Sequence, residues 1–172
     1  MALTQNILDH AHMKDAFEEV LNDTELEYDT VTTTQGVYDF QNNLLSAGKE
    51  PSKAITLFAF DEYFPAVATT DILCRVSDVL MCKPSELAFY AIPKLHIRRV
   101  GDHEAYSAIR AAELGDGSLE ARTIDDAMEY LDLMITSPDL LVSMNQAILR
   151  NKTIGIYDGC KAAVKFAVEG KK

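Results

Sequence analysis

The 172-residue sequence has no tryptophan, only three cysteines, and no apolar run that approaches the roughly 18 residues needed to span a bilayer. Its N-terminal segment also lacks the basic and apolar stretches of a secretory signal. An odd number of cysteines in such a chain disfavours a disulfide framework. We therefore expect a protein with reduced thiols that does not bind membranes, in the cytoplasm or another reducing intracellular setting.

Basic residues are scarce, since 16 Lys and Arg stand against 27 Asp and Glu, for a net charge of −11. The first 50 residues are the most acidic part, with 10 acidic and 2 basic side chains. Such a chain repels polyanions on average, so we expect no direct binding of nucleic acid. One local group of basic residues could bind an acidic partner. Such a group more often neutralises carboxylates of its own chain, and this is the interpretation we favour. This group contains Lys94, His96, Arg98 and Arg99.

The short motifs of several large enzyme classes are missing as well. The chain contains no G-x4-G-K-[ST] phosphate loop, no G-x-S-x-G nucleophile motif and no H-E-x-x-H zinc motif. Gly115, Asp116 and Gly117 begin like a dinucleotide-binding loop, but the third glycine of that pattern is absent. We therefore expect no cofactor, and the sequence favours a protein without enzymatic activity.

Apolar residues recur at helical spacing along most of the chain. This pattern predicts a mainly α protein, a compact helical bundle of about six to eight helices with a few short strands, and an α+β fold with a small sheet is the alternative. No internal repeat or linker-like run occurs, which favours one globular domain over residues 1–172. Helices are expected at 4–21, 34–47, 70–82, 85–91, 103–114, 124–135 and 138–150, and a last helix follows Asp158 and Gly159 and ends near Glu169. Extended segments are expected at 24–33, 54–60 and 95–100.

Local signals mark several helix boundaries. Thr4 can cap the first helix, and Gly115 can end the helix that Asp102 caps. Thr123 followed by Asp126 approximates a capping box for the next helix. The periodicity of that helix is expected to place four apolar side chains inward, namely Ile124, Met128, Leu131 and Ile135.

Three residues of the first expected helix could bind a metal. His12, Asp15 and Glu19 share one helical face, and imidazole and carboxylate groups together suit a divalent transition metal. They would support a metal-dependent enzyme, with His103 as a further ligand. A solvated polar face is the interpretation we favour, because the chain has no Glu-x-x-His pair to complete a carboxylate-bridged helical site.

Cys74, Asp78 and Cys82 follow one another at four-residue spacing in the expected helix 70–82. Zinc sites favour closer cysteine pairs, and no histidine nearby in the sequence could activate either thiol as a nucleophile. We therefore interpret both cysteines as small buried hydrophobic residues.

An acidic stripe, Asp125, Glu129 and Asp132, follows the polar face of helix 124–135. We interpret it as a solubilising surface. The alternative is an acidic inhibitor, in which such a helix imitates the phosphate spacing of nucleic acid and covers a partner's basic binding surface.

The most informative feature is apolar surface on two sides of one helix. Helix 138–150 has Val142 and Leu149 opposite its main apolar stripe, and expected helix 70–82 has Cys74 and Met81 in the same relation. His10 falls inside the apolar arc of the first helix. We take these five residues as interface candidates. They predict a non-enzymatic assembly subunit that binds protein, either itself or other subunits, with a viral or phage particle as one setting.

Overall fold

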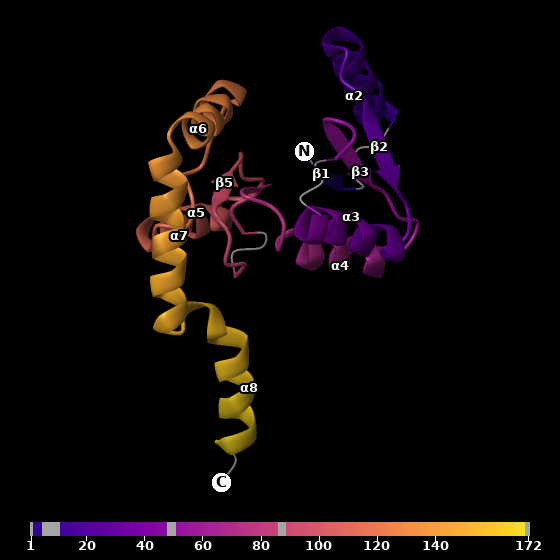
Figure 1. Ribbon diagram of the computed structural model, residues 1–172. Coiled ribbons are helices and arrows are strands. Elements are labelled where there is room, and N and C mark those ends of the chain that lie inside the picture. Colours follow the sequence, from indigo (N-terminus) through magenta and orange to yellow (C-terminus); the bar gives the residue numbers. More distant parts are fainter. Residues whose placement is uncertain (1, 5–10, 48–50, 86–88, 171–172) are drawn as a thin grey trace. The chain divides into compact units, whose positions relative to one another are not determined.

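The computed structural model describes residues 2–4, 11–47, 51–85 and 89–170 (Figure 1). Contacts divide the chain into two compact units, Met1–Val76 and Ser77–Lys172. The described residues form seven α-helices and five short strands, which confirms the prediction of a mainly α protein with a few short strands. The expectation of one globular domain stays a prediction.

A small parallel sheet lies at the centre of the first unit. Strand β3 (Ile55–Phe58) pairs with β1 (Ala2–Thr4) on one side and with β2 (Tyr28–Val31) on the other. In this register Leu57 stands opposite both Leu3 and Thr30. All four residues of β3 are buried, as expected for the central strand of a parallel sheet with a continuous apolar sequence. The expected extended segments at 24–33 and 54–60 each contain one of these strands.

Parallel strands need long crossover connections, and helices supply them in this unit. Helix α2 (Ala11–Thr24) lies between β1 and β2, and α3 (Thr34–Ala47) lies between β2 and β3. Helix α4 (Tyr63–Leu73) follows β3, and the Gln41 amide of α3 donates a 3.0 Å hydrogen bond to the Ile72 carbonyl of α4. The buried core of the unit combines the strand and both helices, and its members are Val37, Phe58, Phe60, Ile72 and Leu73.

Three expectations for helix positions were wrong. Thr4 does not cap a helix, because it is the last residue of β1. The helix expected at 70–82 does not exist: α4 ends at Leu73, and 80–82 form strand β4 (Leu80–Cys82). Apolar residues at 72, 76, 79 and 80 imitate a helical face although they belong to a helix end, a turn and a strand. Of the helix expected at 85–91, residues 85 and 89–91 are turns and bends, and 86–88 lie outside the described residues.

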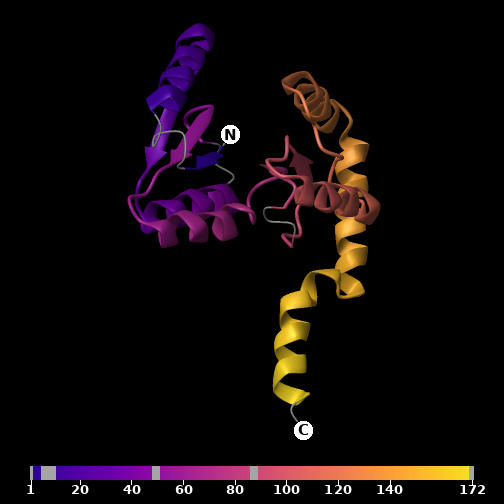
Figure 2. The same cartoon turned by 180° about the vertical axis from the view of Figure 1, so that it is seen from behind.

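The second unit is built on a two-stranded parallel sheet and four α-helices (Figures 1 and 2). Strand β4 pairs with β5 (Lys94–His96), which places Met81 opposite Leu95. The 3-10 helix η1 (Asp102–Glu104) leads into α5 (Ala105–Leu114), followed by α6 (Ile124–Thr136) and α7 (Pro138–Thr153). A second 3-10 helix, η2 (Ile156–Asp158), connects α7 to α8 (Gly159–Glu169). Leu95, Met134 and Met144 form the buried core.

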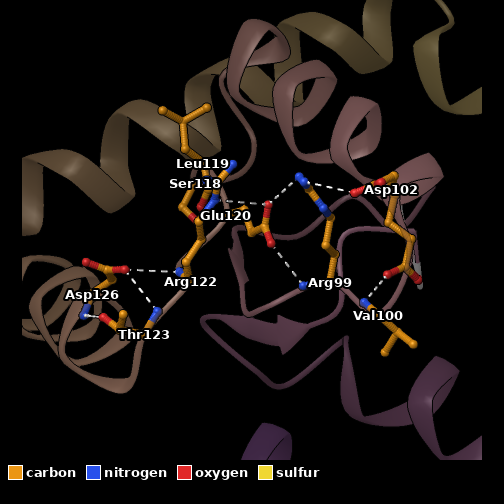
Figure 3. Close-up of polar contacts among 10 residues, drawn as sticks. Arg99, Val100, Asp102, Ser118, Leu119, Glu120, Arg122, Thr123 and Asp126 are labelled. Atoms are coloured by element: carbon orange, nitrogen blue, oxygen red, sulfur yellow. Dashed lines mark hydrogen bonds and ion pairs between the residues drawn. The ribbon is translucent and has the colours of Figure 1, made fainter.

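Two boundary signals in this unit are confirmed, whereas the expected cap at Asp102 was wrong, because Asp102 begins η1 and Glu104 is the N-cap of α5. Helix α7 also continues to Thr153, beyond the expected end at Arg150. Gly115 ends α5 with a φ of 76°, in the left-handed region that glycine adopts most easily. At the start of α6, the Thr123 hydroxyl accepts a 3.1 Å hydrogen bond from the Asp126 amide, and the Asp126 carboxylate accepts a 2.9 Å bond from the Thr123 amide (Figure 3). This reciprocal capping box satisfies two backbone donors that the helix itself leaves unpaired.

The face that α6 buries differs from the expected one. Met134 is buried against the core of the unit, and Tyr130 and Leu131 pack beside it. Ile124 and Ile135, expected inward with Met128, are 81% and 71% exposed. Only Leu131 among the four expected residues packs against the core. Its tertiary contacts cover the part of the apolar surface that carries Tyr130, Leu131 and Met134 and leave Ile124, Met128 and Ile135 exposed.

Candidate protein-interaction surface

Helix α8 has no buried residue along its whole length. Its main tertiary contacts are with the single turn of η2, and in both views it extends beyond the C-terminal end of α7 (Figures 1 and 2). An isolated helix shorter than about 12–15 residues is marginal in water, because few hydrogen bonds offset the cost of nucleation. With 11 residues and no core contact of its own, α8 is the helix of this unit that gains most from a partner.

The exposed surface of α8 is apolar over most of its circumference. Val164, Phe166 and Val168 are 65%, 79% and 73% exposed. At 100° per residue, the small and branched residues fill an arc of roughly 140°. The members of this arc, here called the α8 apolar face, are Cys160, Ala163, Val164, Ala167 and Val168. Lys161 and Lys165 lie along one edge of this face.

A buried ion pair holds the turn from which α8 starts. Lys94 and Asp116 are both buried, and the lysine Nζ lies 3.1 Å from the aspartate Oδ2. The Tyr157 hydroxyl, from η2, donates a 2.6 Å hydrogen bond to the same Oδ2. Burial and the bond to Asp116 both raise the pKa of Tyr157, so the hydroxyl keeps its proton and remains a donor. The Lys94–Asp116–Tyr157 cluster therefore ties η2, and with it the first turn of α8, to the core of the unit.

His96 lies beside this cluster and is fully buried. Its Nδ1 is 2.9 Å from the Ser118 carbonyl oxygen, which can only accept, so Nδ1 carries the proton. Within the part of the chain that the structure describes, His96 Nε2 and Asp116 Oδ1 are buried without a hydrogen-bond partner. Burial lowers the pKa of His96 because the apolar surroundings disfavour the imidazolium ion.

This environment makes stability depend on pH. The unfolded chain binds a proton at His96 below pH 6.5, whereas the folded protein resists it, so the free energy of unfolding should fall as the pH drops below that value. In urea denaturation between about pH 7.5 and 5.5, His96→Gln should show a shallower dependence than the wild type. His103→Gln changes an exposed histidine and serves as the control, in which the unfolding free energy should depend on pH as in the wild type. Equal slopes for wild type and His96→Gln would contradict this account.

Two of the four residues in the basic group at 94–99, Lys94 and Arg99, pair with carboxylates of the same chain. Lys94 pairs with Asp116 as described. The Arg99 guanidinium lies 2.9 Å from one Glu120 oxygen and 3.2 Å from Asp102, and Figure 3 shows it between the two carboxylates. Arg98, the other arginine of the group, is exposed.

The interface candidates from the sequence lie in separate places. Val142 and Leu149 are exposed on α7, and Met81 is exposed on β4. Cys74 is half-buried at the end of α4 in the first unit, so its expected position on one helix with Met81 was wrong. His10 lies outside the described residues. The exposure of α8 was not predicted, although its apolar arc follows from the same helical angles that were used for 138–150.

The metal site suggested by the sequence stays a prediction, because the structure describes only part of it. Asp15 and Glu19 are exposed on α2, and the side chain of His12 is outside the described residues. His103 belongs to the other unit. Among the described residues, no group of three His, Cys, Asp or Glu side chains could hold a metal ion. Cys74, Asp78 and Cys82 do not share a helix, since Cys82 is in β4.

The second unit also contains a cavity of about 720 Å³ between α6, α7 and the 115–118 turn. Its lining is mainly apolar, with Arg150 as its only charged residue. The two unpartnered buried atoms, His96 Nε2 and Asp116 Oδ1, belong to residues outside this lining. None of these lining residues is a His, Cys, Asp or Glu.

These features define a mainly α protein in which the large apolar residues of α8 are exposed. The chain belongs to a family described as a domain of unknown function, DUF6938, whose profile matches residues 1–168. No curated protein and no solved structure matches the chain. Within the described ranges, no helix combines the length and apolarity needed to cross a membrane.

Proposed function

We propose that this protein is a non-enzymatic subunit of a protein assembly and that α8 is the helix through which it binds its partner. The observation that carries the proposal is that none of the residues of α8 is buried. Burial of apolar surface contributes about 25 cal/mol per Å², so covering the α8 apolar face stabilises both the helix and the complex. The setting we propose is a reducing intracellular one, and a viral or phage particle is the alternative.

The anchoring of α8 supports the same function. A docking helix binds more tightly when it is held in place beforehand, because less conformational entropy is lost on binding. Tyr157 and Asp116 supply this restraint at the first turn of α8, while the rest of the helix stays accessible. The helix is therefore oriented at one end and uncovered along its length.

The proposal is tested by sizing the protein in extracts of cells that produce it naturally. The wild type should elute well above the 19.1 kDa of one chain, whereas Val164→Asp with Val168→Asp should elute as a monomer. The isosteric pair Val164→Thr and Val168→Thr should shift elution in the same direction by less, with the helix intact. Val100→Asp is the matched control, because Val100 is 83% exposed and lies outside α8.

Two results would contradict the proposal. One is a wild type that elutes as a single chain in the extract. The other is a complex that survives both α8 double variants while their far-UV circular dichroism equals that of the wild type.

A further inference from the structure

We propose that the partner of α8 is a second copy of this chain, which receives α8 on the exposed face of α6, with the reverse contact forming at the same time. This inference rests on the function proposed above and names its partner. The product is a two-fold dimer with two identical α8–α6 contacts.

The receiving surface is the outer face of α6. Ile124, Met128 and Ile135 project within roughly 40° of one another around the helix and are all exposed. This α6 outer face lies roughly 80–120° around the helix from the buried Met134, beyond Leu131, and its three residues are left exposed by the fold of the unit. It is the apolar stripe that the sequence pattern alone would place in a core.

The charges beside the two faces are complementary. Asp125 and Glu129 lie four residues apart along one edge of the α6 outer face, followed by Asp132. Lys161 and Lys165 have the same four-residue spacing along one edge of the α8 apolar face. When the apolar faces meet, each lysine can approach a carboxylate at the rim. Such pairs contribute modestly to affinity but select the partner and its register.

The expected contact area favours two contacts over one. A single α8–α6 contact covers a face on the order of 400 Å² on each helix, about 800 Å² in all, which is no larger than most crystal-packing contacts. Two equal contacts bury about 1,600 Å², the size of a standard stable interface. The reciprocal dimer therefore reaches the required area where a single contact does not.

The order of the helices permits the reciprocal arrangement. Helix α6 joins the N-terminal end of α7 and α8 follows its C-terminal end, as both views show (Figures 1 and 2). Sixteen residues give α7 a length of about 24 Å, which separates α8 from α6 of the same molecule. Two antiparallel copies of α7 would place each α8 opposite the partner copy's α6.

A lipid surface is the other class of partner that an apolar helix with two lysines could bind. The net charge of −11 opposes approach to an anionic membrane. The acidic edge of the α6 outer face instead offers the lysines of α8 a partner of opposite sign.

The test is a charge-reversal exchange on the purified full-length protein, measured by sedimentation velocity. The wild type should form a dimer of twice 19.1 kDa. Lys161→Glu with Lys165→Glu, and separately Asp125→Lys with Glu129→Lys, should each raise the dimer dissociation constant by about tenfold or more. An equimolar mixture of the two variants should dimerise again, because both contacts then pair opposite charges.

Two further variants serve as controls for this test. Glu129→Lys with Asp132→Lys leaves Asp125 in the first turn of α6, and it should behave like the first α6 variant without weakening the helix start. Asp61→Lys with Glu62→Lys makes the same charge change at two exposed residues of the first unit and should leave the dimer unchanged.

A purified wild type that stays monomeric at every concentration would overturn the inference, as would a mixture that fails to dimerise. Sedimentation of a monomer with vesicles of anionic phospholipid would overturn it in favour of a lipid surface. If the purified protein is monomeric while its complex in extracts still depends on Val164 and Val168, α8 binds a different protein. In that case the dimer proposed here is contradicted, and the function proposed for α8 is still supported.

Discussion

Replacing Asp116 by alanine is expected to lower the free energy of unfolding of the second unit by about 3–5 kcal/mol. The substitution leaves the Lys94 ammonium buried without its counter-ion, because both side chains are almost inaccessible to solvent. It also removes the acceptor of the Tyr157 hydroxyl. Urea denaturation followed by far-UV circular dichroism measures the loss.

Most of this loss should be the cost of burying the Lys94 ammonium without a counter-ion. The net contribution of the intact ion pair to stability should be small. Replacing both partners, as in Lys94→Met with Asp116→Leu, should therefore restore much of the lost stability, since buried ion pairs often exchange for apolar pairs at little net cost. Arg110→Ala breaks the exposed Arg110–Glu113 pair and should cost less than about 1 kcal/mol. Equal losses for Asp116→Ala and Arg110→Ala would contradict the buried-charge explanation.

The same substitution should also release α8. Without Asp116, η2 loses the hydrogen bond that Tyr157 makes to the core of the unit, so amide hydrogen exchange should rise in η2 and the first turn of α8. Tyr157→Phe should produce this rise while leaving the Lys94–Asp116 pair in place. Unchanged exchange in Tyr157→Phe would show that the cluster does not anchor the helix.

Replacing Phe58 by alanine is expected to lower the free energy of unfolding of the first unit by about 3–5 kcal/mol. Phe58 is fully buried in the central strand, and the Phe40 ring meets it edge-on with ring centroids 5.2 Å apart. Removing the ring leaves a cavity that α3 and α4 cannot fill without moving. Hydrogen exchange of the β3 amides reports the loss for this unit separately.

Phe64→Ala is the matched control for Phe58→Ala. Phe64 lies at the start of α4 with its side chain exposed, so removing the ring should change the unfolding free energy by about 0.5 kcal/mol or less. Similar exchange rates in β3 for the two alanine variants would contradict the core assignment.

The parts of the fold that the sequence predicted correctly depend on neighbouring residues. Helix α3 has the bounds expected from its apolar spacing. Gly115 ends α5 and Thr123 with Asp126 starts α6 because each signal acts within four residues. The sequence predicted a wrong helix where the apolar spacing continues from one element into the next. At 70–82, residues of α4 and β4 together have the spacing of one helical face.

The candidate surface could be predicted only in part. A last helix ending near Glu169 was expected, and its apolar arc follows from the helical angles, but a sequence does not show whether another element covers that arc. The anchoring cluster gave no local signal at all, because Lys94, Asp116 and Tyr157 are 22 and 41 residues apart.

By itself the sequence determined the mainly α character, most helix limits and the excess of apolar helical surface, since all of these arise from propensity, periodicity and capping over a few residues. Tertiary structure alone decided which apolar faces are covered. It buried Met134 of α6 and left Ile124 and all of α8 outside, because burial depends on which distant elements the chain brings together.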